Sequence, residues 1–145
     1  MLEEKIQLIN TIYSGITTIN SNNTKCLLAF SDLDNFLKTE YKVEYEPFII
    51  TTDITYTLLN LCSHKSNDIN LCAQNTSKQL VSIINEHSIK RILPVLLDFK
   101  SSLKWKTSLN RLILLDELAQ AAPLTVSRNL NTIIPVISDM MWDSK

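Results

Sequence analysis

An internal repeat constrains the fold of this chain more than any other feature. Residues 92–98 read Ile-Leu-Pro-Val-Leu-Leu-Asp, and residues 133–139, 41 positions later, read Ile-Ile-Pro-Val-Ile-Ser-Asp. A weaker third copy begins at Pro47, which lies 47 residues before Pro94. Aliphatic repeats of about 40–47 residues are typical of stacked helix pairs. Because one pair cannot bury its apolar face alone, the repeat predicts a solenoid in which each pair covers its neighbour.

The composition supports a helical fold. The chain has one glycine, Gly15, among 145 residues, whereas a sheet protein with many tight turns needs more. Its 45% hydrophobic and 20% charged residues are ordinary for a folded domain. Three cysteines without a disulfide-like framework favour a reducing, cytoplasmic location. No apolar run reaches the roughly 18 residues that a transmembrane helix needs, so we expect no membrane span.

Apolar periodicity predicts seven helices. Pro47 suits a helix first turn, Pro94 and Pro135 fall inside helices and bend them, and Pro123 ends a helix. In the sixth helix the inward residues include Leu109, Leu112 and Leu115. The predicted helices span residues 2–19, 24–37, 48–62, 68–86, 88–100, 104–122 and 126–141. This pattern predicts an all-α solenoid of HEAT or armadillo type, with about three and a half helix pairs in a single domain over residues 1–145. Because the last helix lacks a partner, we expect a fragment without its C-terminal cap.

The C-terminal half carries a specific string of motifs. Leu-Lys-Trp-Lys at 103–106 is followed by an aliphatic helix, by Val-Ser-Arg at 126–128, and by a final segment, 133–145, that ends Met-Met-Trp-Asp-Ser-Lys. This string resembles the N-terminal HEAT region of fungal-type translation elongation factor three. A related segment occurs in the ribosome-bound activator of the starvation-responsive eIF2-alpha kinase. The resemblance is close over residues 80–145 and diffuse over residues 1–79.

The resemblance implies contact with the ribosome. In that family the HEAT region docks on the ribosome beside two ATP-binding cassettes. This chain has no Gly-x-x-x-x-Gly-Lys-[Ser/Thr] motif, and one glycine cannot build a phosphate-cradling loop. We therefore expect no enzyme activity and no cofactor in this chain, with ATP used only through cassettes that it lacks. The predicted partners are ribosomal RNA and ribosomal proteins, and neither DNA nor a membrane.

Basic residues concentrate in one stretch of the sequence. Residues 61–145 carry ten bases and seven acids, whereas residues 1–60 carry four bases and eight acids. Between residues 90 and 111, which include Arg111, only Asp98 opposes the positive charges. The stretch is either a solvated helix face or a patch that meets an acidic partner such as ribosomal RNA. The candidates for ribosome or RNA contact are Lys90, Arg91, Lys100, Lys104, Trp105 and Lys106.

Two tryptophans and two aspartates could stabilise the repeats rather than bind a partner. Trp105 could stack on a base between its flanking lysines, or it could anchor a turn by packing on the next repeat, as we also expect for Trp142. Asp98 and Asp139 recur after the two proline-containing helices, and we expect them to accept hydrogen bonds from backbone N–H groups in the following turns. Together with Pro94 and Pro135, Asp98, Asp139 and Trp142 are the predicted structural positions of the repeat.

Other reactive residues do not form a recognisable site. Cys62, His64 and Cys72 lack a fourth ligand at zinc-like spacing, so we interpret the two cysteines as small core residues. His87 lies at a helix junction and is expected to be a cap or a surface residue. The sequence therefore predicts a ribosome-associated HEAT-repeat module of an elongation factor three-like protein. The alternative is a protein-only scaffold, of the kinase-activating or transport type, that binds peptides.

Overall fold

The computed structural model describes residues 2–17, 23–101 and 105–142, and within them every regular element is helical. Two of the elements are short 3₁₀ segments, η1 (Val43–Tyr45) and η2 (Phe99–Ser101). The α-helices are α1 (Leu2–Thr17), α2 (Asn23–Thr39), α3 (Glu46–Ile49), α4 (Thr52–Leu61), α5 (Asn67–Ser82), α6 (Glu86–Leu96), α7 (Trp105–Ala121), α8 (Pro123–Arg128) and α9 (Leu130–Trp142).

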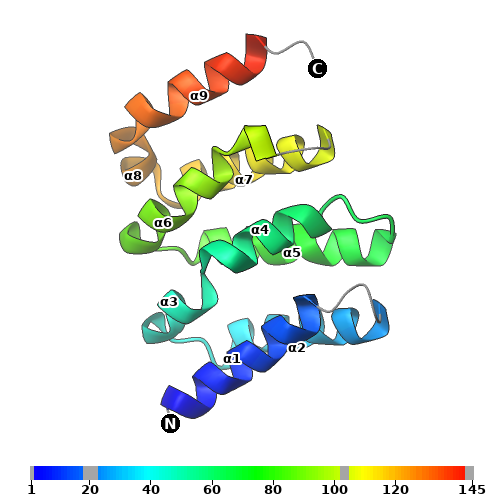
Figure 1. Cartoon of the computed structure of the whole chain (residues 1–145). Helices are drawn as coiled ribbons and strands as arrows, with labels where there is room; N and C mark the ends of the chain where they lie inside the picture. The colour runs from blue at the N-terminus through cyan, green and yellow to red at the C-terminus, as the bar shows by residue number, and fades with distance from the viewer. Residues whose placement is uncertain (1, 18–22, 102–104, 143–145) are drawn as a thin grey trace.

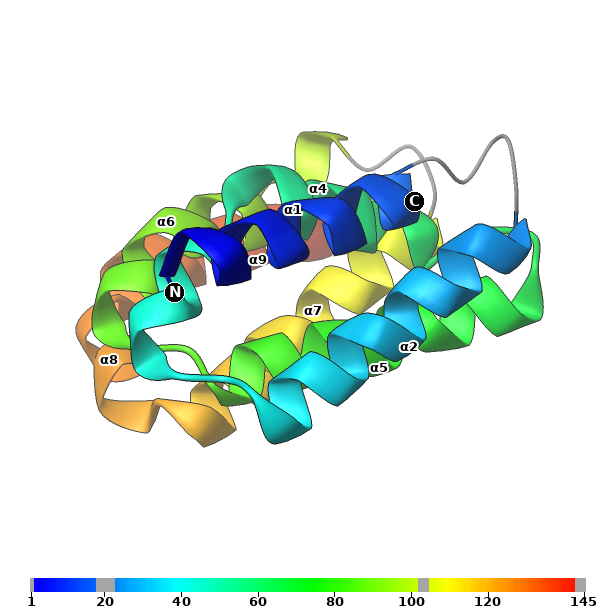
Figure 2. The ribbon, with the colours of Figure 1, turned by 90° about the horizontal axis from the view of Figure 1, so that it is seen from below.

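The helices form two layers (Figures 1 and 2). Layer A contains α1, α4, α6 and α9, with α3 and α8 leading into α4 and α9, whereas layer B contains α2, α5 and α7. Consecutive long helices pack as the hairpins α1–α2, α4–α5 and α6–α7, and α5 touches both α2 and α7. The predicted all-α solenoid of stacked pairs is confirmed, and α9 continues layer A beyond the third pair.

The first hairpin depends on the single glycine. A Cβ atom on Gly15 of α1 would lie 2.8 Å from the Cβ of Ala29 on α2, closer than two such atoms can pack. The two helices therefore approach each other through a position where a side chain has no room. Ile12, Ile16 and Phe30 are buried beside this contact in the core that runs through the stack.

Helix α6 shows how local sequence sets a helix boundary. Asn85 caps it, because its Oδ1 accepts hydrogen bonds from the backbone N–H groups of His87 and Ser88, at 3.0 and 3.1 Å. The backbone N–H of Asn85 in turn donates to Glu46 Oε1 at 2.8 Å, and its side chain also donates to Glu46. The buried Glu46 carboxylate thus lies at the N-terminus of α6, where the helix dipole favours a negative charge.

Two predicted helices are each divided in the structure. The segment predicted as one helix over residues 48–62 is broken between α3 and α4 at Thr51, whose backbone is extended and whose Oγ1 accepts a hydrogen bond from the N–H of Ile54 at 3.2 Å. A threonine that caps a helix cannot also continue one. The segment predicted over residues 126–141 is divided at Asn129 between α8 and α9. It also begins earlier, because Pro123 lies in the first turn of α8 rather than only ending α7.

The third copy of the repeat is a false alignment. Pro94 and Pro135 both lie inside layer A helices, as predicted, and both are exposed. Pro47 does begin a helix, but that helix is the short α3, which precedes α4. Its counterpart is Pro123, which begins the short α8 ahead of α9. The four prolines therefore form two pairs of equivalent positions instead of one series.

Candidate functional site

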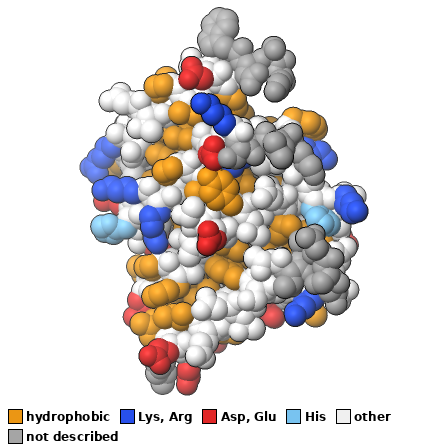
Figure 3. Space-filling model, viewed as in Figure 1, with side chains coloured by type: hydrophobic (Ala, Val, Ile, Leu, Met, Phe, Trp, Pro, Cys, Tyr) orange, Lys and Arg blue, Asp and Glu red, His pale blue; other side chains and the backbone are white. Residues whose placement is uncertain are grey.

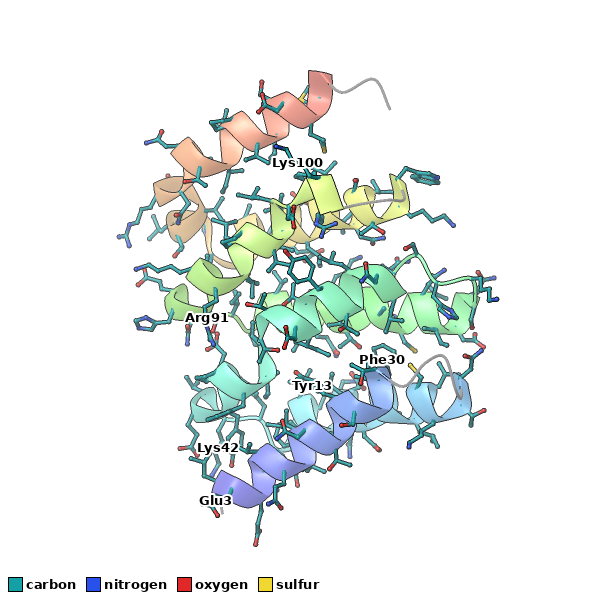
Figure 4. The ribbon with its side chains drawn as sticks, viewed as in Figure 1. Glu3, Tyr13, Phe30, Lys42, Arg91 and Lys100 are labelled. Atoms are coloured by element: carbon teal, nitrogen blue, oxygen red, sulfur yellow. The ribbon has the colours of Figure 1, made fainter. Side chains whose placement is uncertain are left out.

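The basic residues singled out in the sequence do not form one patch. Lys90 and Arg91 are exposed in the first half of α6, whereas Lys100 is exposed in η2, beyond the other end of that helix (Figure 4). Lys106 is exposed on α7 in the other layer. Lys104 lies outside the described residues. The basic residues that cluster in the sequence are therefore divided between the two layers and between the two opposite sides of the stack.

One edge of the molecule does gather positive charge. Besides Lys90 and Arg91 it includes Arg128 of α8, whose Nη1 lies 2.9 Å from Glu86 Oε1. We call Lys90, Arg91 and Arg128 the basic edge. Figure 3 shows lysine and arginine side chains along the left of the visible face, where α6 and α8 lie. Sequence reasoning missed Arg128 because it lies 37 residues after Arg91 and the stacking of repeats brings the two together.

The arginine at position 91 is partly held in place. Its Nη2 donates to Ser88 Oγ at 2.7 Å and its Nη1 donates to the carbonyl oxygen of Pro47 at 3.5 Å. Ser88 lies in the same helix as Arg91, and Pro47 lies in the preceding repeat. The guanidinium is therefore oriented on the surface instead of sampling many rotamers, which lowers the entropy cost of binding an anion there.

Arg111 does not belong to the predicted basic patch on the surface, because only 1% of its surface is exposed. Its Nε donates to the carbonyl oxygen of Val95 at 3.1 Å. Burial lowers the pKa of its guanidinium, and the nearby charge of Asp98 and the hydroxyl of Tyr56 act in the opposite direction. This arginine contributes to the joint between repeats and adds no charge to the surface.

Asp98 has a partner in the preceding repeat. The hydroxyl of Tyr56 on α4 donates to Asp98 Oδ2 at 2.9 Å, and this hydrogen bond raises the pKa of the tyrosine. Together with the buried Arg111 of α7, the contact joins α4, the end of α6, and α7 through polar side chains. The predicted bonds from Asp98 to backbone N–H groups stay a prediction.

Asp139, at the equivalent position of α9, is exposed. It lines an open cavity of about 300 Å³ between the end of α6 and α9, together with Asp98, Lys100, Val136 and Met140 among others. The side chain of Trp142 is not among those described, so its predicted turn-anchoring role stays a prediction.

The structure contradicts the predicted packing of Trp105. Its side chain is 71% exposed at the start of α7, and the Nζ atom of Lys106 lies 5.9 Å from the ring centroid. This distance suits a weak cation–π contact. Trp105 therefore presents an aromatic surface to solvent at the start of α7, on the side of the stack opposite the basic edge.

The cysteines are placed as core or partly buried residues. Cys62 is buried, and burial raises the pKa of its thiol to about 12, whereas Cys72 is only partly buried. His64 Nδ1 accepts a hydrogen bond from the backbone N–H of Ser66 at 3.0 Å. In the part of the chain that the structure describes, no group of three Cys, His, Asp or Glu side chains could hold a metal ion. His87 lies on the surface, and Asn85 rather than His87 is the cap.

No helix within residues 2–17, 23–101 and 105–142 combines the length and the hydropathy that crossing a bilayer requires.

Similarity to known proteins agrees with this architecture. Elongation factor 3 of Phytophthora infestans is 39% identical over 88 residues, which cover 60% of this chain and 8% of that protein. Elongation factor 3 of Gonapodya prolifera is 29% identical over 145 residues, which cover 96% of this chain and 13% of that protein. Elongation factor 3B of Saccharomyces cerevisiae is 31% identical over 112 residues, which cover 74% of this chain and 10% of that protein.

The chain thus spans about a tenth of the length of these relatives. No solved structure matches it significantly. The family model described as "EF3 N-terminal HEAT repeat" matches residues 3–145, which include all of the described helices except Leu2, the first residue of α1. The chain therefore belongs to the family of elongation factor 3 N-terminal HEAT repeats.

Proposed function

We propose that this chain is a ribosome-associated binding module of an elongation factor 3-like protein, and that it contacts ribosomal RNA through the basic edge. The observation that carries the proposal is the convergence of Lys90, Arg91 and Arg128 on one edge of the stack, where Arg128 pairs with Glu86. Among the described residues, three cations against Glu86 and the buried Glu46 leave a local excess of positive charge. The names of the relatives, all elongation factors, support the ribosome as the partner.

The fold suits such a role. A stack of helix pairs offers long edges, and the partly held guanidinium of Arg91 suits the recognition of a phosphate. Double-stranded RNA is recognised mainly through its shape and its backbone. We therefore expect contacts to phosphates rather than to particular bases. The proposal implies work in the cytoplasm, where translating ribosomes are.

Charge reversal tests the proposal. Lys90→Glu with Arg91→Glu should weaken co-sedimentation with ribosomes about tenfold or more, and should flatten the dependence of log K on log salt by roughly one for each lost phosphate contact. The matched control reverses two lysines of layer B, Lys38 and Lys78, and should keep the slope of the unmodified protein. Equal binding and equal slope for the two double variants would contradict the proposal.

The remaining candidates are separated from the basic edge and are tested one at a time. Lys100→Glu, Lys104→Glu and Lys106→Glu each replace one positive charge with a negative one, and Trp105→Ala removes the stacking surface. A change in salt slope for any of them adds that residue to the RNA contact. Treatment with ribonuclease distinguishes the alternative of a protein-only scaffold, since such binding survives the loss of RNA.

A further inference from the structure

Layer B carries one exposed leucine in each of its three helices. Leu28, Leu71 and Leu109 are 61%, 55% and 44% exposed. Each is the fifth or sixth residue of its helix, α2, α5 or α7, and the three are spaced by 43 and 38 residues. We call them the leucine row. A single exposed leucine is common in proteins, but one at the same place in every repeat is a repeated surface feature.

The arrangement of the helices brings these leucines into line. α2, α5 and α7 lie side by side, α5 touching both neighbours, and all three begin on the same side of the stack, at the right in Figure 1 (see also Figure 2). Packed helices lie about 8–10 Å apart. The leucine row therefore crosses the three helix axes with steps of about 10 Å. Trp105 lies one turn before Leu109 on the same face of α7, so it widens the apolar surface at that end.

A second series of residues follows the leucine row. Lys25, Lys65 and Lys106 are exposed near the starts of the same three helices and are spaced by 40 and 41 residues. The exposed acids beside them are Asp68, near the start of α5, and Asp32, one turn after Leu28 on α2. Three lysines against two carboxylates leave the described part of this surface with a small positive excess. The apolar row and the lysines therefore recur together, once in each helix pair.

We propose that the leucine row binds an extended, acidic segment of a protein partner. An extended chain in the polyproline II conformation has three residues per turn and rises about 3.1 Å per residue, so every third side chain lies on the same face about 9 Å further on, which matches the step from one leucine to the next. Apolar side chains at every third position contact Leu28, Leu71 and Leu109, and carboxylates between them face the lysines. This surface goes beyond the proposed contact with RNA, because the basic edge lies elsewhere on the molecule.

The shape of the surface favours an extended segment over a helix. An amphipathic helix presents an apolar stripe that is several side chains wide and needs a matching apolar groove. The exposed residues one turn away from Leu28 and Leu71 are polar, namely Thr24 and Asp32 on α2 and Asn67 and Asn75 on α5. A row that is one leucine wide suits single-file contact by an extended chain.

A designed peptide tests the proposal on the whole chain. The probe is a fluorescent peptide of about twelve residues with leucine at every third position and glutamate and glutamine between. We expect binding with a Kd in the micromolar range, because the apolar contact is small. In a Trp142→Phe background, where Trp105 is the only tryptophan, the emission of Trp105 should shift when the peptide binds. A peptide of the same composition with its leucines adjacent should bind about tenfold more weakly.

Matched variants separate the leucine row from general stickiness. Leu28→Ser, Leu71→Ser and Leu109→Ser combined should weaken peptide binding about tenfold or more. The control removes three exposed apolar side chains elsewhere, through Leu124→Ser, Ile134→Ser and Met141→Ser, and should leave peptide binding unchanged. Circular dichroism and thermal unfolding confirm that both triple variants are folded.

A charge swap tests the role of the lysines. Lys25→Glu, Lys65→Glu and Lys106→Glu should weaken binding of the acidic peptide and should favour a peptide in which lysine replaces glutamate. The proposal is overturned if the peptide shows no binding up to about 1 mM, or if the row variant and the control bind it equally. It is also overturned if the shuffled peptide binds as well as the phased one. The row variant should keep the ribosome co-sedimentation and salt slope of the unmodified protein, so the two proposals fail separately.

Discussion

Helices α6 and α9 carry the same seven-residue motif in different surroundings. α6 packs against α4 on one side and α7 on the other, whereas α9 is joined to the stack mainly through α8, which touches α7. Leu93 of α6 is 5% exposed, but its counterpart Ile134 of α9 is 58% exposed. The prolines at the next position, Pro94 and Pro135, are exposed in both helices. The motif therefore fixes which side of the helix faces solvent, and the neighbouring helices decide how much of the other side is buried.

The polar end of the motif shows the same difference. Asp98 accepts a hydrogen bond from Tyr56 and lies near the buried Arg111, whereas Asp139 is exposed. A residue that holds three helices together in one repeat is thus a surface residue in the next. The role of a repeated side chain in this stack therefore depends on the helices packed around it, which are α4 and α7 for Asp98.

The largest predicted effect separates the two aspartates. Asp98→Ala should lower the free energy of unfolding by about 3 kcal/mol, because it removes the acceptor of the Tyr56 hydroxyl and a negative charge near the buried Arg111. Asp139→Ala should change that free energy by less than about 0.5 kcal/mol. Urea unfolding of both variants measures the difference. Equal losses for the two variants would show that the motif has the same role in both helices.

The aliphatic positions give the next largest effect. Leu93→Ala should cost about 2–3 kcal/mol, since it removes a buried side chain and leaves a cavity. Ile134→Ala should cost less than about 1 kcal/mol, because that side chain is already mostly in water. Thermal and urea unfolding compare the two. A loss at Ile134 as large as that at Leu93 would mean that another surface covers α9 in solution.

Alkaline pH should destabilise the covered repeats before it affects α9. Burial raises the pKa of Cys62 in the folded chain to about 12 from the ordinary 9.0. Between these two pH values the thiol is therefore protonated in the folded chain and ionised in the unfolded chain. This contribution is fully present below pH 9 and is lost as the pH rises towards 12. At about pH 10.5 the loss is roughly 2 kcal/mol, from one and a half pKa units.

The control for this pH effect is Cys62→Ala, compared with its own stability at pH 7. In reducing buffer, its loss of stability between pH 7 and about pH 10.5 should be smaller by roughly 2 kcal/mol than that of the unmodified chain. The pKa of Tyr13 is also raised by burial, so part of the alkaline loss remains in the variant. The same pH dependence in Cys62→Ala and in the unmodified chain would show that ionisation of the Cys62 thiol does not cause the loss of stability.

The smallest predicted effect concerns what the two motifs share. Pro94→Ala and Pro135→Ala each restore a backbone N–H inside a helix whose proline faces solvent. We expect the two variants to change the free energy of unfolding in the same direction, by about 1 kcal/mol or less. Differential scanning calorimetry of the pair checks this. Changes of opposite sign would show that the two prolines occupy different environments.

The sequence predicts the repeat architecture well, because burial of one side of each helix requires apolar residues at regular spacing. Helices, hairpins and the positions of Pro94 and Pro135 follow from that spacing. The break at Thr51 does not, since a threonine inside an apolar run fits both a helix interior and a cap. Only its hydrogen bond to the N–H of Ile54 selects the cap.

The candidate site was harder to predict, because side-chain chemistry alone does not report burial. Leu109 was expected to face inward on α7, yet it is exposed, while Thr107 and Arg111 of the same helix are buried. α7 carries aliphatic residues on more than one side, so its pattern does not select a face. The charge of Arg111 suggested a surface, but its acceptor Val95 and its neighbour Asp98 come from another helix and are invisible to a local pattern.

Native-state hydrogen exchange tests the central claim, that each helix pair is protected by the pair beside it. We predict slow exchange for the amides of α4, α5, α6 and α7, each of which packs against at least two other helices, and faster exchange for the amides of α9, which packs mainly against the short α8. Protection of α9 equal to that of α6, under conditions in which the chain is monomeric, would contradict the account.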